Sequence, residues 1–238
     1  MNKSTQFWPQ RAFAVCISAV AVAGVISSTP GYSEPATPQV ATRKTDTEHV
    51  YLLRGLFNVF SIGMDELRMK LYRRGIFATV HNHLEWERLA NEAVRDYKSG
   101  RVGAIVIVGH SAGAIDAVDM ANKIGSGGVP VNLLVTLDPA FRTTVTNSNV
   151  RWVVNLYMPN GIGAKVYKRS GYSGVIENID LHNVPVHHMT LDKSDFVHDR
   201  VIKYTLRARK NGGSPSQAKA PAAAGPAKMV GLRRAAPP

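Results

Sequence analysis

The feature that most constrains the fold is the alternation of apolar runs with amphipathic segments along residues 49–208. The runs IFATVHN, GAIVIVG, VNLLVTLDP and others are short and apolar, and segments such as EWERLANEAVRDYKSG between them repeat apolar residues at helical spacing. Apolar strands that alternate with helices are typical of a parallel sheet covered on both faces. We expect strands at 49–55, 76–82, 103–109, 131–139, 151–159 and near 180–186, and helices at 61–75, 85–100, 112–125 and roughly 193–208.

Ser111 lies in the pattern G-x-S-x-G within GAIVIVGHSAGAIDAVDMANKI. The pattern alone is weak, because roughly one sequence in ten of this composition would contain it by chance. Its setting is more specific, since a wholly apolar strand precedes the serine and a helix follows it. Gly109 and Gly113 would allow the strand and the helix to pack closely, and the helix N-terminus favours developing negative charge. The sequence therefore predicts that Ser111 is a nucleophile, against the alternative of a small residue at a tight crossover.

A serine nucleophile needs a base, and the base needs an acid that orients it. Asp138 follows the apolar strand VNLLVTL, at the sheet edge where open α/β sheets bind their ligands. Burying a carboxylate there is costly without a partner, although an aspartate that opens a turn before Pro139 is also common. We predict that Asp138 is the acid, and Asp180 is the alternative.

The base is expected in the segment NIDLHNVPVHHMTLD, where a loop before the last helix returns over the sheet. His188 is the preferred base and His187 the alternative. His182 lies too early for this role, and His198 falls inside the expected helix. A metal site at the adjacent histidines is disfavoured, because their side chains point apart and no third ligand is near.

An oxyanion hole requires two backbone N–H groups. Ala112 follows the nucleophile and supplies one. The second is expected from the loop after the first strand, where Gly55 lets the backbone turn inward and Leu56 or Phe57 donates. Arg54 on this loop either pairs with an acid or shapes the turn.

The net charge of +12 comes mainly from the two ends of the chain, because residues 45–206 carry 18 Lys and Arg against 16 Asp and Glu. A nearly neutral centre and tails without interleaved aromatic residues argue against nucleic-acid binding. Residues 1–33 are interpreted as a signal peptide or an N-terminal membrane anchor, since Lys3 and Arg11 precede a short apolar run. We therefore expect an exported protein, periplasmic or secreted, with an uncleaved anchor as the alternative.

Three further interpretations follow from composition. Residues 34–47 are expected to be a linker, and 209–238 a disordered, basic, Ala/Pro-rich tail that is able to contact a membrane surface. The only cysteine, Cys16, lies in the apolar run, so we expect neither a disulfide nor a cysteine metal site in the mature chain. His81 and His83 are interpreted as loop or cleft residues rather than metal ligands.

Taken in order, the stretches LLRG, GHSAG, TLDPA and HHMTLD resemble the α/β-hydrolase superfamily, and its small esterase, lipase and thioesterase-like members in particular. The resemblance covers roughly residues 48–206. It implies a three-layer α/β-hydrolase fold with a mostly parallel central sheet and little or no cap domain, placed here at 48–208. It also implies Ser111, Asp138 and His188 as a triad, the same residues that the pattern of strands and loops favours.

The activity implied is hydrolysis of an ester or thioester through an acyl-enzyme, without a cofactor or metal. The substrate would be a small or lipid-like acyl ester, and a monomer is expected. Two alternatives are an acyltransferase that uses the same triad and a non-catalytic envelope-binding protein that retains the fold. The segments 139–150 and 159–180 are expected to form the loops over the site, and 159–174 within the second is expected to be a mobile flap or an ordinary surface loop.

Overall fold

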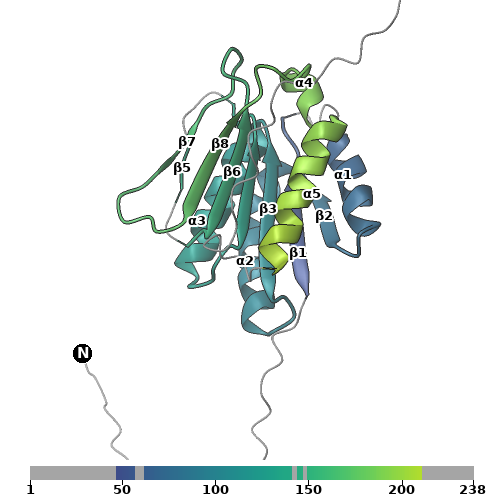
Figure 1. The fold of residues 1–238 in the computed structure, drawn as a ribbon. Coiled ribbons are helices and arrows are strands. Elements are labelled where there is room, and N and C mark those ends of the chain that lie inside the picture. The colour runs from purple at the N-terminus through teal and green to yellow at the C-terminus, as the bar shows by residue number, and fades with distance from the viewer. Residues whose placement is uncertain (1–46, 57–61, 141–143, 147–148, 211–238) are drawn as a thin grey trace, which may run out of the picture. The chain divides into compact units, whose positions relative to one another are not determined.

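A computed structural model describes residues 47–56, 62–140, 144–146 and 149–210. Its centre is a six-stranded sheet with the strand order β2-β1-β3-β4-β6-β8, in which every neighbouring pair is parallel (Figure 1). The strands are β1 (Glu48–Leu53), β2 (Phe77–His81), β3 (Ala104–His110), β4 (Leu133–Leu137), β6 (Trp152–Tyr157) and β8 (Val175–Asp180). The expected parallel sheet is confirmed.

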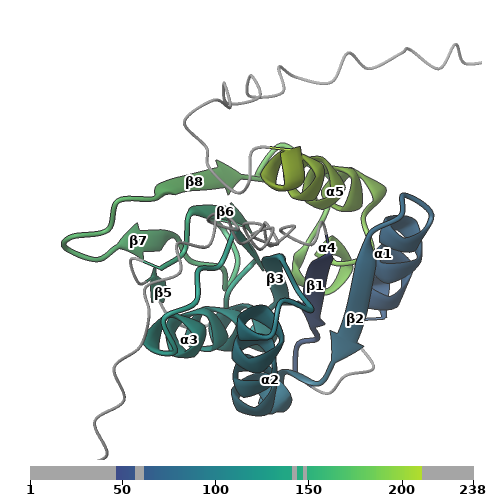
Figure 2. The ribbon, with the colours of Figure 1, turned by 90° about the horizontal axis from the view of Figure 1, so that it is seen from below.

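Helices cover both faces of this sheet, as the view in Figure 2 shows. The helices α1 (Gly63–Tyr72) and α5 (Asp195–Lys210) lie on one face, and α2 (Trp86–Lys98) and α3 (Ala112–Ser126) lie on the other. A short 3-10 turn, η2 (His83–Glu85), precedes α2, and the short helix α4 (His188–Leu191) precedes α5. The three-layer α/β architecture is therefore confirmed.

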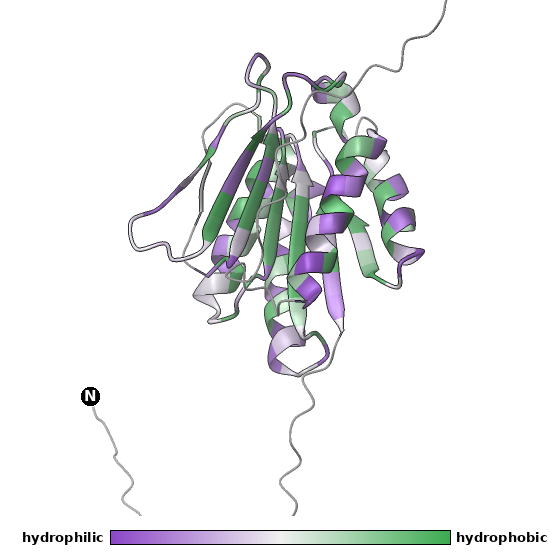
Figure 3. Cartoon of the chain, viewed as in Figure 1, coloured by the Kyte–Doolittle hydropathy of each residue, from purple (hydrophilic) through white to green (hydrophobic). Residues whose placement is uncertain are grey.

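Alternate side chains of the central strands enter two apolar clusters, one beneath each helical layer. Val50 and Leu52 of β1 belong to the cluster that includes residues of α1 and α5. Tyr51 and Leu53 belong to the cluster that includes residues of α2 and α3. Because both faces of the sheet are covered, apolar residues occupy both sides of the central strands over much of their length, where the hydropathy colouring in Figure 3 is largely green.

The end of the sheet differs from the expectation. The strand expected near 180–186 is wrong in position, because β8 spans Val175–Asp180 and residues 181–187 form the loop to α4. β8 is the last strand of the sheet, and its sequence VIENID mixes polar residues with apolar ones, so its periodicity is weak. The last helix, expected at 193–208, is α5.

The segments expected to form loops over the site contain a small second sheet. β5 (Thr144–Thr146) and β7 (Val166–Lys168) pair in parallel. The described parts of 139–150 and 159–180 contain no helix, and the end of the second segment, which was expected to be loop, is the strand β8.

The predicted signal peptide or anchor at 1–33 and most of the linker, 34–46, lie outside the described residues, as does the tail from residue 211 onwards. Thr47 is described, and its carbonyl oxygen accepts a hydrogen bond from the Gly103 N–H at 2.8 Å. α5 continues to Lys210, two residues into the segment expected to be tail. Within the described ranges, no helix combines the length and the apolar character needed to cross a membrane.

Candidate active site

Ser111 occupies a tight turn between β3 and α3. Its backbone angles, φ 59° and ψ −121°, are unusual for a residue that has a side chain. Holding a residue in such a region costs about 1–3 kcal/mol, which the surrounding structure must offset. The Ser111 N–H donates to the carbonyl oxygen of Leu137 at 2.9 Å, so the neighbouring strand β4 helps to fix the turn.

Two glycines allow the chain to pack around this turn. A Cβ atom on Gly109 would lie 2.1 Å from the carbonyl oxygen of Gly113, and one on Gly113 would lie 2.4 Å from that of Arg54. Both obstacles are backbone atoms, which cannot move aside as a flexible side chain would. The need for glycine at these two positions, predicted from the sequence, thus follows from the contacts between β3, α3 and the end of β1.

The three residues of the predicted triad form a continuous hydrogen-bonded chain. The Ser111 hydroxyl donates to Nε2 of His188, with Oγ and Nε2 2.8 Å apart. Nδ1–H of His188 donates to Oδ2 of Asp138 at 2.7 Å. Because a carboxylate only accepts, the proton of the neutral imidazole must lie on Nδ1, which leaves Nε2 free to accept from the serine. This arrangement matches the geometry required of a nucleophile, its base and an orienting acid.

Asp138 is fully buried at the end of β4, and it also has a positive φ, 49°. Its Oδ1 accepts a hydrogen bond from the Met158 N–H at 2.8 Å, so both carboxylate oxygens have a partner. The backbone of Gly163 packs directly against the same carboxylate, because a Cβ atom on Gly163 would lie 1.6 Å from Oδ1 of Asp138. These contacts fix the carboxylate where His188 can reach it.

The alternative acid and base do not join this chain. Oδ1 of Asp180 accepts from both the backbone N–H and the ring Nδ1–H of His182, each at 2.8 Å. The backbone hydrogen bond, followed by the ring, lowers the pKa of Asp180. His187 is exposed immediately before α4. His198 is buried in α5, where its Nε2–H donates to the carbonyl oxygen of Asp192 at 2.6 Å.

The candidate oxyanion donors lie on the two segments that meet at the turn. Ala112 is the first residue of α3, so its N–H is at the positive end of the helix. Leu56 follows β1 in a half-exposed turn, and Phe57 lies outside the described residues. The close approach of Gly113 to the Arg54 carbonyl brings the loop after β1 against the start of α3. The two predicted donors thus come from adjoining backbone segments.

Arg54 pairs with an acid, which was one of the two roles left open for it. Its Nη2 donates to both carboxylate oxygens of Asp65 in α1, at 2.7 and 2.6 Å. The Arg54 backbone N–H donates to the His81 carbonyl at 3.0 Å, which continues the β1–β2 pairing. The side chain therefore ties the loop after β1 to the first turn of α1.

Sequence reasoning missed His110, the residue directly before the nucleophile. Its side chain is 2% exposed, and its Nε2–H donates to the backbone carbonyl of His188 at 3.0 Å. Burial, and then the neighbouring His188, lower the pKa of His110 to about 4. The only signal in the sequence was a polar residue at the end of a wholly apolar strand.

A row of polar side chains that supports the loop after β6 was also missed. The Thr136 hydroxyl donates to Oδ1 of Asn155 at 2.8 Å, and Nδ2 of Asn155 donates to the carbonyl of Ala164 at 2.9 Å. The Asn178 side chain in turn bonds both backbone groups of Val166, at 2.9 and 3.0 Å. This row holds the segment that contains Gly163 against Asp138.

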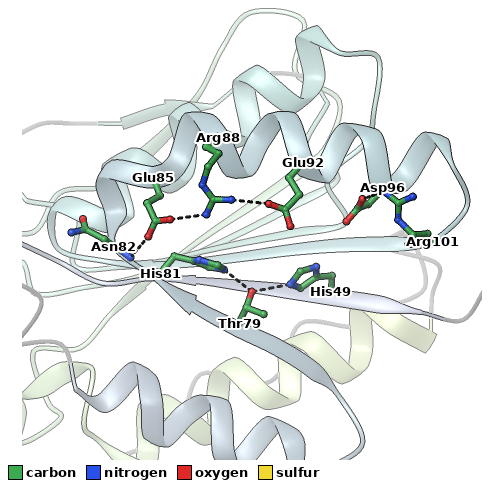
Figure 4. Close-up of polar contacts among 9 residues, drawn as sticks. All are labelled: His49, Thr79, His81, Asn82, Glu85, Arg88, Glu92, Asp96 and Arg101. Carbon is green, nitrogen blue, oxygen red and sulfur yellow. Dashed lines mark hydrogen bonds and ion pairs between the residues drawn. The ribbon is translucent and has the colours of Figure 1, made fainter.

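The histidines near β2 have structural partners. His83 is buried and its Nδ1 forms a hydrogen bond with the Asp116 carboxylate of α3, so the part of its interpretation that made it an exposed loop residue is wrong. His81 and His49 both direct Nε2 at the Thr79 hydroxyl, each at 2.8 Å (Figure 4). The described residues contain no group of three His, Cys, Asp or Glu able to hold a metal ion.

A cavity of about 530 Å³ lies beside these residues, at the amino ends of β1 and β2. His49, Thr79 and Phe77 line it from the strands, and Glu92 and Asp96 line it from α2. Its charged groups largely neutralise one another, because Arg88 pairs with Glu92 and Arg101 with Asp96 (Figure 4). Since Ser111 lies at the opposite, carboxyl end of the strands, this cavity is separate from the candidate active site.

No protein-family model matches the sequence, and no curated protein matches it either. Solved structures that resemble the chain include human thioesterase 2, at 7% identity and a TM-score of 0.46 over 69% of this chain and 97% of that one. A cutinase-like protein from Cryptococcus sp. has 12% identity and a TM-score of 0.43 over 71% and 96% of the two chains. The NocB thioesterase domain, in a covalent complex with a fluorophosphonate nocardicin G analogue, has 12% identity and a TM-score of 0.42 over 68% and 94%.

The assignment of the fold rests on the topology of the molecule itself. The sheet is parallel and covered on both faces, and a serine with strained backbone joins a central strand to the next helix. The acid and the histidine follow the serine in the chain order Ser, Asp, His, which is the order of α/β hydrolases. The chain therefore has an α/β-hydrolase-like fold.

Proposed function

We propose that this protein is a serine hydrolase that cleaves an ester or thioester through an acyl-enzyme intermediate. The observation that carries the proposal is the continuous chain of two hydrogen bonds from the Ser111 hydroxyl through His188 to Asp138. The three side chains come from the ends of β3 and β4 and the start of α4, and two of them require strained backbone. Such an arrangement fits a reactive serine better than a structural one.

The first half of the reaction forms the acyl-enzyme. Nε2 of His188 takes the proton of Ser111 as Oγ attacks the carbonyl carbon of the substrate. The carbonyl electrons move onto oxygen, and the N–H groups of Ala112 and Leu56 are the donors proposed to stabilise that negative charge. When the carbonyl re-forms, the bond to the alcohol or thiol breaks, and His188 transfers its proton to the leaving group.

The second half returns the enzyme to its starting state. His188 removes a proton from water as the oxygen of the water attacks the acyl carbon. The tetrahedral intermediate collapses, the bond to Oγ breaks, and the proton passes back to Ser111. The carboxylate of Asp138 holds Nδ1–H throughout and stabilises the imidazolium that forms twice in each cycle. The residues named here complete this sequence without a cofactor or a metal.

An apolar acyl group is the substrate that the surroundings of Ser111 favour. Leu56 follows β1, Ile162 follows β6, and Met189 follows His188 directly, and all three are exposed large apolar residues. Parallel strands present their carboxyl ends at one edge of the sheet, so these residues and Ser111 belong to the same edge. A small or lipid-like acyl ester is therefore the proposed substrate.

The proposal extends to location on the basis of the sequence. A basic, then apolar, then turn-rich segment at 1–33 supports export, to the periplasm or beyond, with an uncleaved anchor as the alternative. Fractionation of cells that express the full chain with a C-terminal epitope tests this. Recovery of the chain in the cytoplasm at full length contradicts it.

Covalent labelling with a fluorophosphonate tests the proposed activity, because this probe phosphonylates an activated serine. The wild-type protein should be labelled, and Ser111→Ala and His188→Ala should lose labelling. His187→Ala and the exposed Ser126→Ala are the matched controls, and both should be labelled as the wild type is. Labelling of Ser111→Ala at the wild-type level would remove the serine from its proposed role.

Product analysis then separates hydrolysis from acyl transfer. With p-nitrophenyl esters of increasing chain length, the free carboxylic acid should accumulate in step with p-nitrophenol. If added alcohols convert most of the product into a new ester at millimolar concentration, the enzyme is an acyltransferase instead. A folded wild-type protein with neither labelling nor ester cleavage would contradict both activities and favour the binding-protein alternative.

A further inference from the structure

The proposed base His188 is held through its backbone as well as through its ring. His110 ends β3 and directly precedes Ser111, and its Nε2 lies 3.0 Å from the carbonyl oxygen of His188. The two imidazole rings lie side by side, with centroids 5.2 Å apart and planes inclined at 35°. The same strand end therefore presents the nucleophile and contacts the backbone of the base.

The direction of this hydrogen bond fixes the protonation of His110. A carbonyl oxygen only accepts, so Nε2 of His110 must carry a proton. In the neutral ring Nδ1 is then unprotonated, and gaining a proton there would leave Nε2–H in place. Burial keeps the ring neutral by lowering its pKa to about 4. The hydrogen bond from Nε2–H to the His188 carbonyl oxygen is therefore present whether the His110 ring is neutral or protonated.

The segment that carries His188 needs such support. His188 is the first residue of α4, which is a single helical turn that follows the loop 181–187. Its ring must place Nδ1 2.7 Å from Asp138 and Nε2 2.8 Å from Ser111, which come from two different strands. A backbone shift of about 1 Å would lengthen one of these bonds, and a misplacement of that size can lower a rate about 100-fold.

The other end of α4 is fixed independently. Asp192 follows the helix, and its carboxylate accepts from the Gly63 N–H at the start of α1, at 3.1 Å. The Asp192 carbonyl also accepts from His198 at 2.6 Å. With the far end of the turn held by α1 and α5, the hydrogen bond from His110 holds the backbone at its beginning.

We propose that His110 is a positioning residue, whose N–H group holds the His188 backbone at the distance from which its ring reaches both Ser111 and Asp138. This rests on the proposed function. In this role His110 does not contact the substrate. Losing its hydrogen bond to His188 should therefore lower the rate of the chemical step and leave substrate binding nearly unchanged.

The test compares two substitutions at His110. His110→Leu removes the donor, whereas His110→Gln keeps an N–H donor of similar reach. With a short p-nitrophenyl ester, His110→Leu should lower kcat about 10- to 100-fold and change KM less than about threefold. His110→Gln should recover kcat to within about fivefold of the wild type. If His110→Leu does not fold, His110→Asn replaces it, because the shorter side chain withdraws the donor from the carbonyl.

A matched control separates positioning from loss of stability. Asn132→Ala removes another buried side chain that bonds backbone, since Oδ1 of Asn132 accepts from the Ile105 N–H at 3.1 Å near the amino end of β3. At a temperature where every variant is folded by circular dichroism, Asn132→Ala should keep the wild-type kcat. Wild-type kcat in folded His110→Leu, or equal losses in His110→Leu and His110→Gln, would overturn the proposal.

The outcome for His110 is distinct from the outcome for the proposed function. If Ser111→Ala labels as the wild type does, the proposed hydrolase is wrong. If labelling depends on Ser111 and His188 but proceeds at the wild-type rate in His110→Leu, the hydrolase stands and the positioning role is refuted.

Discussion

Glu48 offers a test of the electrostatics of the fold that is independent of the active site. It is the first residue of β1 and is 7% exposed, and its carboxylate oxygens have no hydrogen-bond partner among the described residues. Burial raises the pKa of Glu48 from 4.5 to about 7, and the Arg209 charge only partly opposes this. The folded protein therefore binds the Glu48 proton more tightly than the unfolded chain does.

The sign and size of the effect follow from linkage. Because the pKa is raised in the folded state, its contribution to stability is complete below pH 4.5, declines as pH rises to about 7, and is lost above that. Each tenfold change in proton affinity corresponds to about 1.4 kcal/mol, so the whole change is about 3 kcal/mol in the free energy of unfolding. Glu48→Gln has no proton to lose and should escape this decline.

Urea denaturation at pH 4.5, 5.5, 6.5 and 8 measures the effect. The free energy of unfolding of Glu48→Gln minus that of the wild type should increase by about 3 kcal/mol from pH 4.5 to pH 8. Glu66→Gln is the control for replacing a glutamate by glutamine at the surface, because Glu66 is exposed on α1. A difference for Glu48→Gln that is constant within about 0.5 kcal/mol would refute the reasoning.

Three further substitutions test other parts of the structure. Gly113→Ala places a Cβ atom 2.4 Å from a backbone carbonyl oxygen, and it should lower the free energy of unfolding by about 3 kcal/mol or more. Gly161→Ala is its control, because the nearest atom to a Cβ there lies at 3.3 Å, and this variant should unfold in urea almost as the wild type does. Burial raises the pKa of Asp192 to about 6. The free energy of unfolding of Asp192→Asn minus that of the wild type should therefore increase as pH rises from 4 to 8, by up to about 3 kcal/mol, and a difference that does not vary with pH contradicts this. Asp138→Asn should slow fluorophosphonate labelling by about 10³- to 10⁴-fold, and a comparable loss in Asp180→Asn would move the acid to the other aspartate.

Central strands could be predicted from the sequence because burial on both faces demands apolar residues throughout. β3 and β4 are buried along almost their whole length, and both lie in the runs that predicted them. β8 has one neighbouring strand in the six-stranded sheet and carries exposed polar residues. Its apolar pattern is therefore weak, and the sequence predicts the strand several residues too late. β5 and β7 are three residues each, too short for a pattern to reveal.

The candidate site could be narrowed from the sequence but not completed. The end of an apolar strand can be recognised in the sequence, which is why Ser111 and Asp138 could be identified as candidates. The sequence favours His188 as the base and leaves His187 as the alternative, because adjacent residues differ in the direction of their side chains. In the structure it is the ring of His188 that bonds both Ser111 and Asp138. The contact between His110 and His188 joins residues 78 apart in sequence, and no local pattern encodes it.

The backbone provides an argument about the site that does not depend on side-chain chemistry. Among the described residues, Ser111 and Asp138 are the only two other than glycine with positive φ. Each costs about 1–3 kcal/mol to hold there, a noticeable part of the roughly 5–15 kcal/mol by which a domain is stable. Strain of this kind persists where the surrounding structure enforces it, and it gathers at sites that work by fixed geometry. Both strained residues belong to one hydrogen-bonded chain, and this supports the proposed reactive serine over two unrelated turns.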